Sequence, residues 1–296
     1  MKTPYDIASS NKRKTVLIFL FFIILAVTSA YMMGQALGYN GLTIAGLFLI
    51  LSGVWSLISY YFSGSLILTL ANAKPATREE HFALYTAVEN LCIASGLPKP
   101  KLYVIHDQAP NAFATGRDPK HAVVAVTTGL LHKLRDIEIE AVIAHELSHI
   151  KNYDTRILGV ITILAGSIAL LSDIFLRSLW LQGDRRNNNQ IFMIIGLVAA
   201  ILAPVIATLM QLAISRKREF LADADGALLT RYPEGLASAL EKIAADDHKL
   251  KTASVATAHL YIENPFKSGS KKNSWYVNLF STHPNVEERI KILRSM

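Results

Sequence analysis

The sequence predicts a mainly α membrane protein whose soluble part contains a small sheet. The chain of 296 residues is 51% hydrophobic but only 18% charged, whereas about a quarter of the residues in soluble domains are charged. The apolar residues are concentrated in four long blocks, as in membrane helices. Two Val-rich stretches between the second and third blocks are typical of strands. We therefore expect four transmembrane helices and a soluble α+β part.

The four apolar blocks are the candidate transmembrane helices, and three of them are long enough to cross a bilayer. They span residues 16–33, 42–62, 157–172 and 191–214, and the third continues weakly to residue 181. Asp173 and Arg177 interrupt the third block, four residues apart, where they can pair on one helix face. The sequence leaves open whether 157–181 crosses the bilayer completely.

Basic residues near the block ends predict the orientation of the chain. The positive-inside rule assigns the side with more Lys and Arg to the cytoplasm. In a four-helix topology, one side receives Lys12, Arg13, Lys14, Lys151, Arg156, Arg216, Lys217 and Arg218. Arg185 and Arg186 fall on the other side, but they are fewer. We therefore expect both soluble segments to face the cytoplasm.

The first block has a second interpretation as a signal peptide. Thr28, Ser29 and Ala30 form a small-x-small cleavage pattern after a basic start. The apolar run is long for that role and continues past the pattern, which favours an uncleaved helix. Cleavage would leave residues 64–156 on the same side of the membrane.

The blocks divide the chain into four parts. Residues 1–70 form an N-terminal transmembrane hairpin, and residues 157–214 form a second one. Residues 71–156 and 215–296 are the two segments of the soluble domain. The first soluble segment reads as a helix at 78–96, strands at 101–107 and 122–128 around a loop at 108–121, and a helix at 137–151. Asp136 is the expected N-cap of that last helix.

The overall charge and the cysteine content exclude some classes of protein. The single cysteine, Cys92, rules out a disulfide within the chain and a cysteine-based zinc site, and we expect it to be a core residue. The net charge is +7, but the sequence shows no nucleic-acid motif and no basic face with interleaved aromatics. The basic residues follow the membrane topology instead, so no nucleic-acid partner is expected.

Residues 145–149 read His-Glu-Leu-Ser-His within the predicted helix at 137–151. Because residues four apart share a helix face, His145 and His149 can direct their imidazoles at one zinc ion. Glu146 lies beside them and can act as general base on a water that the ion activates. The alternative is an amphipathic helix with two surface histidines.

The third zinc ligand must come from another part of the chain, since no histidine follows His149 closely. Glu219 and Asp223 stand four apart just after the fourth block, with Asp225 nearby. Glu219 suits a ligand, and Asp223 suits an acceptor that orients a ligand histidine. The alternative is an acidic and basic helix end at the membrane interface. The functional interpretation predicts a zincin-like α+β catalytic domain, assembled from 71–156 with the HExxH helix and 215–296 with the third ligand.

Three motifs, in this order, resemble those of the HtpX family of membrane-bound zinc metalloproteases, relatives of the CAAX prenyl proteases. They are AVIAHELSHI at 141–150, SRKREFLADADGA at 215–227 and STHPNVEERIKIL at 281–293, and PNAFATG at 110–116 also matches. The resemblance covers nearly the whole chain and implies one Zn²⁺ on His145, His149 and Glu219, with Glu146 as the base. Asn285 departs from the second proline that many relatives carry after His-Pro.

The resemblance also implies where the protein acts and on what. It implies a multi-pass protein of the bacterial inner membrane with its catalytic part in the cytoplasm. The expected activity is endopeptidase cleavage of misfolded or damaged membrane proteins, in protein quality control and the stress response. The expected partners are polypeptide substrates and the lipid bilayer.

Two further stretches are candidates for catalysis and substrate binding. His283 lies in the third motif and is a candidate for stabilising the oxyanion of the tetrahedral intermediate; the alternative is a histidine at a helix start. Asn111 and Ala112 precede a predicted strand, and we expect the substrate backbone to pair with an edge there. A plain hairpin connection is the alternative.

Two other functions compete with a membrane-tethered peptidase. One is a transporter or binding protein with a non-catalytic metal site, but charge within the blocks is sparse. The other is a protease with its metal inside the bilayer. The charged residues before His145 disfavour it, because a lipid-embedded helix would not carry them: Lys133, Arg135, Asp136, Glu138 and Glu140.

Overall fold

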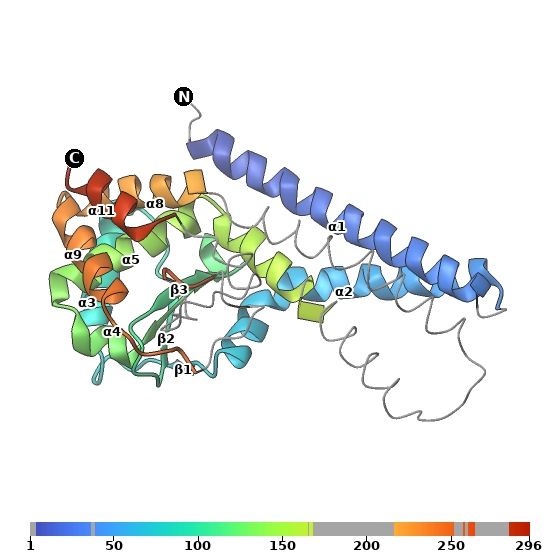
Figure 1. Ribbon diagram of the computed structural model, residues 1–296, viewed down its shortest axis with the longest axis horizontal. Helices are drawn as coiled ribbons and strands as arrows, with labels where there is room; N and C mark the ends of the chain where they lie inside the picture. Colours follow the sequence, from blue (N-terminus) through green and yellow to red (C-terminus); the bar gives the residue numbers. More distant parts are fainter. Residues whose placement is uncertain are drawn as a thin grey trace.

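The computed structural model describes residues 4–36, 39–164, 166–167, 216–251, 257, 260–263 and 284–296. Two long helices, α1 (Pro4–Ala36) and α2 (Gly41–Leu70), lie side by side and extend away from a compact part that holds the sheet and the remaining labelled helices (Figure 1). The N-terminal end of α1 reaches back to that compact part (Figure 1).

The two long helices are candidate membrane spans. The segments Ser9–Met32 and Gly41–Leu70 have mean hydropathies of 2.4 and 2.0. Large apolar side chains on both are exposed, including Ile24 (64%) and Ile50 (66%), as expected where lipid covers a helix. The buried face of α2 is instead a stripe of serines, which permits close packing: Ser52, Ser56, Ser59 and Ser63. Both helices extend beyond the predicted blocks 16–33 and 42–62.

The sheet is small and mixed. Its strands are β1 (Lys74–Pro75), β2 (Lys101–Ile105), β3 (Ala112–Thr115) and β4 (Val123–Thr127), in the order β1-β2-β4-β3. β2 and β4 are parallel, and β3 runs antiparallel to β4. β3 is therefore an edge strand.

The sheet is buried on both faces. Val124 and Val126 of β4 belong to the larger core cluster, whereas Val123 and Ala125 belong to a second cluster on the opposite face. The larger cluster includes residues of α3 (Phe82–Ser95), α5 (Asp136–Lys151), α8 (Arg216–Thr230), α9 (Pro233–Ala244) and α11 (Val286–Leu293). The second cluster includes the end of α2, so the sheet packs against the base of the membrane hairpin.

The structure corrects several predicted boundaries. β2 and β4 are shorter than 101–107 and 122–128, and β3 lies inside the stretch predicted as a loop. The helix α3 starts at Phe82, not at 78, and ends as predicted before Gly96, whose φ of 68° is left-handed. Residues 154–164 are helical, so the third block begins three residues earlier than predicted. Apart from residues 166–167, the rest of that block, with Asp173 and Arg177, and the whole fourth block lie outside the described residues.

The start of α5 shows why the predicted N-cap is wrong. The helix begins at Asp136 and Arg135 occupies the N-cap position. The side chain of Glu138, three residues on, accepts the backbone N–H of Arg135 at 2.8 Å. This bond satisfies an amide at the helix start and extends the helix by one residue relative to 137–151.

Candidate metal centre

The helix α5 is the central element of the site, because it is packed by neighbours on almost every side. It contacts α3, α8, α9 and β3. Every residue from 138 to 150 except Glu140 is buried. His145 and His149 are 1% and 7% exposed, and their rings lie edge to face with centroids 4.8 Å apart. The two histidines therefore lie on a buried helix face, whereas the alternative interpretation placed them on the surface.

The helix α8 brings Glu219 to the two histidines because it packs closely against α5. At Gly226 the two backbones approach so tightly that a Cβ atom would lie 3.1 Å from the backbone nitrogen of His145. Glu219, two turns earlier on α8, is 8% exposed and faces the same side. The close approach fixes the distance between the residues of the two helices.

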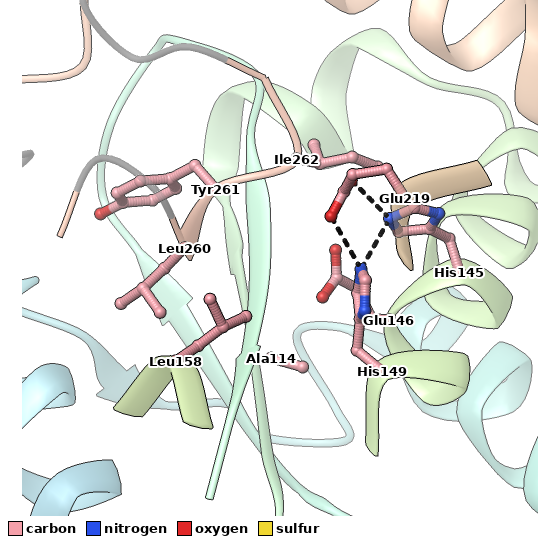
Figure 2. A pocket seen from close by; sticks show the side chains of 9 residues that line it. All are labelled: Ala114, His145, Glu146, His149, Leu158, Glu219, Leu260, Tyr261 and Ile262. Carbon is pink, nitrogen blue, oxygen red and sulfur yellow. Dashed lines mark hydrogen bonds and ion pairs between the residues drawn. The ribbon is translucent and has the colours of Figure 1, made fainter. Parts of the chain in front are cut away.

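The donor atoms of His145, His149 and Glu219 have the spacing of a metal site. The two Nε2 atoms lie 3.2 Å apart. Nε2 of His145 is 3.7 Å from Oε2 of Glu219, and Nε2 of His149 is 3.5 Å from Oε1 of the same carboxylate. Ligands about 2 Å from a tetrahedral zinc ion are about 3.3 Å from one another. Figure 2 shows the three side chains pointing toward one another. Among the described residues they form the one such group, and their donor set fits zinc.

A carboxylate and an arginine hold His145. Its Nδ1 lies 2.9 Å from Oδ1 of Asp223, one turn after Glu219 on α8. Arg289 of α11, which is fully buried, donates to both oxygens of Asp223, at 2.8 Å from Nε and 2.7 Å from Nη2. Burial opposes the charge of Asp223, but the Arg289 guanidinium holds the pKa of that carboxyl below its usual range. Asp223 is therefore ionised and keeps the proton of His145 on Nδ1.

A second carboxylate holds His149. Oδ2 of Asp154 lies 3.1 Å from Nδ1 of His149. Burial favours the neutral ring, but the bond to Asp154 and the nearby Glu219 raise the pKa of His149 to about 9. Without a metal ion, the site therefore holds a proton at neutral pH. A metal ion must displace that proton to bind Nε2.

Glu146 lies beside the three donors and is 2% exposed (Figure 2). Burial raises the pKa of its carboxyl above the ordinary range, although both histidines oppose that shift. The backbone N–H of Ala114 on β3 donates to this carboxylate. The edge strand thereby orients Glu146 with its carboxylate free of the metal ligands.

The pocket in front of the donors is walled by the edge strand and by residues 260–262 (Figure 2). Asn111 and Ala112 lie at the start of β3 and are buried. The carbonyl of Ala112 accepts the N–H of Ile262 at 3.0 Å, and the Asn111 side chain donates to the carbonyl of Glu263 at 3.0 Å. The backbone carbonyl of Ala112 and the side chain of Asn111, where we expected a substrate to bind, are thus bonded to the chain's own residues Ile262 and Glu263.

The structure brings His145, Glu146, His149, Glu219 and Asp223 together, and His283 lies outside the described residues. Sequence reasoning missed Arg289, although it lies in the motif STHPNVEERIKIL. It also missed Asp154, five residues after His149, which a count of acidic residues near the motif would have found.

Comparisons with known proteins show the family of the chain. The model of peptidase family M48 matches residues 79–296. A protease HtpX homolog of Dictyoglomus turgidum is 46% identical over 301 residues, which cover 99% of this chain and 95% of the relative. Homologs of Caldanaerobacter subterraneus and Listeria monocytogenes are 44% and 41% identical, and each pairing covers at least 98% of both chains.

A solved structure supports the fold. The crystal structure of S. mikatae Ste24p matches with a TM-score of 0.51 at 20% identity, over 95% of this chain. The chain spans 62% of the length of that protein. At this level of identity the likeness concerns the fold alone.

Proposed function

This chain belongs to peptidase family M48 and is a membrane-associated metalloprotease of the HtpX type, and from that premise we propose that His145, His149 and Glu219 hold its catalytic zinc ion. The observation that carries the proposal is the spacing of the three donors, 3.2 to 3.7 Å between nearest atoms in a buried site. Two imidazoles and one carboxylate leave one position of a tetrahedral zinc ion open, as a catalytic site requires.

We assign the role of general base to Glu146. When bound, zinc polarises the scissile carbonyl and makes water a stronger nucleophile at neutral pH. Glu146 takes a proton from the attacking water and later delivers it to the leaving amine. Burial suits Glu146 to the role of base, because a carboxylate with a raised pKa takes up a proton more readily than an exposed one. His283 is our candidate for stabilising the oxyanion.

The substrate chain is proposed to pair in extended form with the edge strand β3, near Asn111 and Ala112. β3 has β4 on one side only, and its Ala114 touches the general base. A backbone laid along this edge would pass directly over Glu146. Because Ile262 now bonds to Ala112, we expect a substrate to pair beyond that bond or to displace residues 260–263.

We further propose the finer architecture and the cellular role. Four helices cross the bacterial inner membrane, and the catalytic domain is assembled on the cytoplasmic side from 71–156 and 215–296, between hairpins 1–70 and 157–214. The substrates are misfolded or damaged membrane proteins. The packing of α8 and α9 on α5 and of α11 on α8 and α9, together with the exposed apolar faces of α1 and α2, supports this arrangement.

The metal requirement tests the proposal. The full-length protein in detergent is stripped with a chelator and assayed on an unfolded protein before and after one equivalent of zinc, magnesium or calcium is added. We expect zinc to restore cleavage and the two harder cations to fail, because imidazoles favour zinc. Restoration by magnesium or calcium would contradict the zinc assignment.

A further inference from the structure

We propose that Asn11, on the first membrane helix, is a positioning residue of the metal centre. Asn11 holds the carboxylate of Asp154, which in turn holds the ligand ring of His149. The inference rests on the proposed metal site and deepens it. It makes α1 a part of the catalytic machinery as well as a membrane anchor.

The contacts of Asn11 are short, buried and specific. Its Nδ2 donates to Oδ1 of Asp154 and to the backbone carbonyl of Asn152, both at 2.8 Å. Asn11 is 2% exposed. Because both partners are acceptors, only the amide nitrogen can face them, and both of its hydrogens are used. The side chain is therefore fixed in one orientation.

The two carboxylate oxygens of Asp154 have different partners. Oδ2 accepts from His149, while Oδ1 accepts from Asn11 and lies 3.6 Å from Nε of Arg218. Asp154 is 1% exposed, so its charge needs donors on both oxygens. Without Asn11, the contact of Oδ1 that remains among the described residues is the longer one to Arg218, and the carboxylate would be freer to turn away from the ring.

The turn after α5 explains how Asp154 reaches back to His149. The helix ends at Lys151, and Tyr153 then adopts a φ of 59°, a left-handed conformation that non-glycine residues rarely adopt. Lys12, the neighbour of Asn11, places its Nζ 4.4 Å from the centroid of the Tyr153 ring. Two successive residues of α1 thus hold both the turn and the carboxylate that the turn presents.

A purely structural role for Asn11 makes a different prediction. If its bond to the carbonyl of Asn152 only closed the end of α5, its loss would lower stability and leave the metal affinity of the folded protein unchanged. A positioning role changes the metal affinity itself, because the ring of His149 must then be ordered when the metal binds. Removal of such an outer partner weakens metal binding about 10- to 100-fold.

The test is the zinc dissociation constant of the full-length protein in detergent, measured by competition with a chromophoric chelator. All variants carry Glu146→Gln to prevent self-cleavage. We expect Asn11→Ala to weaken zinc binding about 10-fold and Asp154→Asn to weaken it at least as much. Two controls on α1 should keep the starting affinity: Gln35→Ala, an exposed amide, and Thr15→Val, a buried residue whose hydroxyl bonds to a carbonyl of its own helix.

Three comparisons decide the outcome. Asn11→Ala added to Asp154→Asn should cause little further loss, because Asn11 acts through Asp154. If Asn11→Ala does not fold, Asn11→Ser replaces it, and a smaller loss is expected from its shorter donor. An affinity equal to that of Thr15→Val in the folded Asn11 variant would overturn the inference. If instead the protein without these changes bound zinc no better than His149→Ala, the proposed metal site itself would be wrong.

Discussion

Each proposed ligand histidine is held at Nδ1 by a carboxylate, and each carboxylate is held by a residue from a distant part of the chain. Arg289 binds Asp223 behind His145, and Asn11 binds Asp154 behind His149. A carboxylate at Nδ1 favours a proton on that nitrogen, so Nε2 is the nitrogen that a metal ion would bind. The site therefore reaches well beyond the three donors.

The raised pKa of His149 predicts how metal affinity depends on pH. In the metal-free protein this pKa is about 9, so below pH 9 a proton competes with the ion. The apparent zinc affinity should rise by up to about tenfold per pH unit between pH 7 and 9 and should flatten above that. Chelator competition across this range measures it, with release of about one proton per zinc at pH 7. An affinity that is flat from pH 7 to 9 would contradict the assignment.

The buried pair of Arg289 and Asp223 predicts a large effect of one substitution. Arg289→Met should destabilise the protein by about 3 to 5 kcal/mol, because Asp223 would remain buried without its cation. Asp223→Asn in the Arg289→Met background should recover part of that loss. Denaturant unfolding in detergent measures both variants, and Arg294→Met, which removes an exposed arginine of the same segment, is the control. Equal free energies of unfolding for Arg289→Met and Arg294→Met would show that the Arg289–Asp223 ion pair does not stabilise the fold.

At the scale of elements, side-chain bonds hold the start of α5 as well as the face that carries the metal ligands. Glu138 is fully buried and receives three side chains: Lys242 at 2.7 Å, Ser238 at 2.6 Å and Arg135 at 3.0 Å. Lys242 and Ser238 belong to α9, so this carboxylate joins two helices. The start of α5 is thereby bonded to α9, and at its other end Asn11 donates to the carbonyl of Asn152.

Glu138 predicts a specific loss of stability in acid. Burial opposes its charge, but the bonds from Lys242 and Ser238 lower its pKa to about 2, below the ordinary value of 4.5. Its ionised form therefore stabilises the fold above pH 4.5, and this contribution disappears as pH falls from 4.5 toward 2. Glu138→Gln should cost about 1 to 3 kcal/mol at pH 7 and should make stability less dependent on pH in that window. Unfolding curves at pH 7 and pH 3 would show it; an unchanged pH dependence would contradict it.

The elements also show what the sequence can and cannot predict. The pair His145 and His149 follows from helical spacing alone, and Glu219 follows from the need for a remote ligand. The sequence alone does not predict β3, because Ala112–Thr115 is short and flanked by turn residues. Its pairing with β4 makes it a strand. Arg289 and Asn11 act over separations of 66 and 143 residues, and no periodicity in a single sequence reports such contacts.

At the scale of the whole molecule, both ends of the described chain support the same site from different sides. α1 supplies Asn11 to one side of the metal centre, and α11 supplies Arg289 to the other. The described third-block residues Ile157, Val160 and Ile161 pack with Ile18 of α1 in a core cluster of their own. The first membrane hairpin thus packs against the third block, and its Ile67 and Leu68 share a second core cluster with the sheet. We therefore expect the site to require the full chain.

The central claim is that this buried site is a zinc peptidase with Glu146 as its base. The most direct test is cleavage of an unfolded protein by the zinc-loaded full-length enzyme and by Glu146→Gln, with bound zinc quantified in both. We predict equal zinc content and loss of at least about 1,000-fold in turnover for the variant, since the base takes part in each proton transfer. Comparable cleavage by both proteins, with zinc bound in both, would contradict the claim.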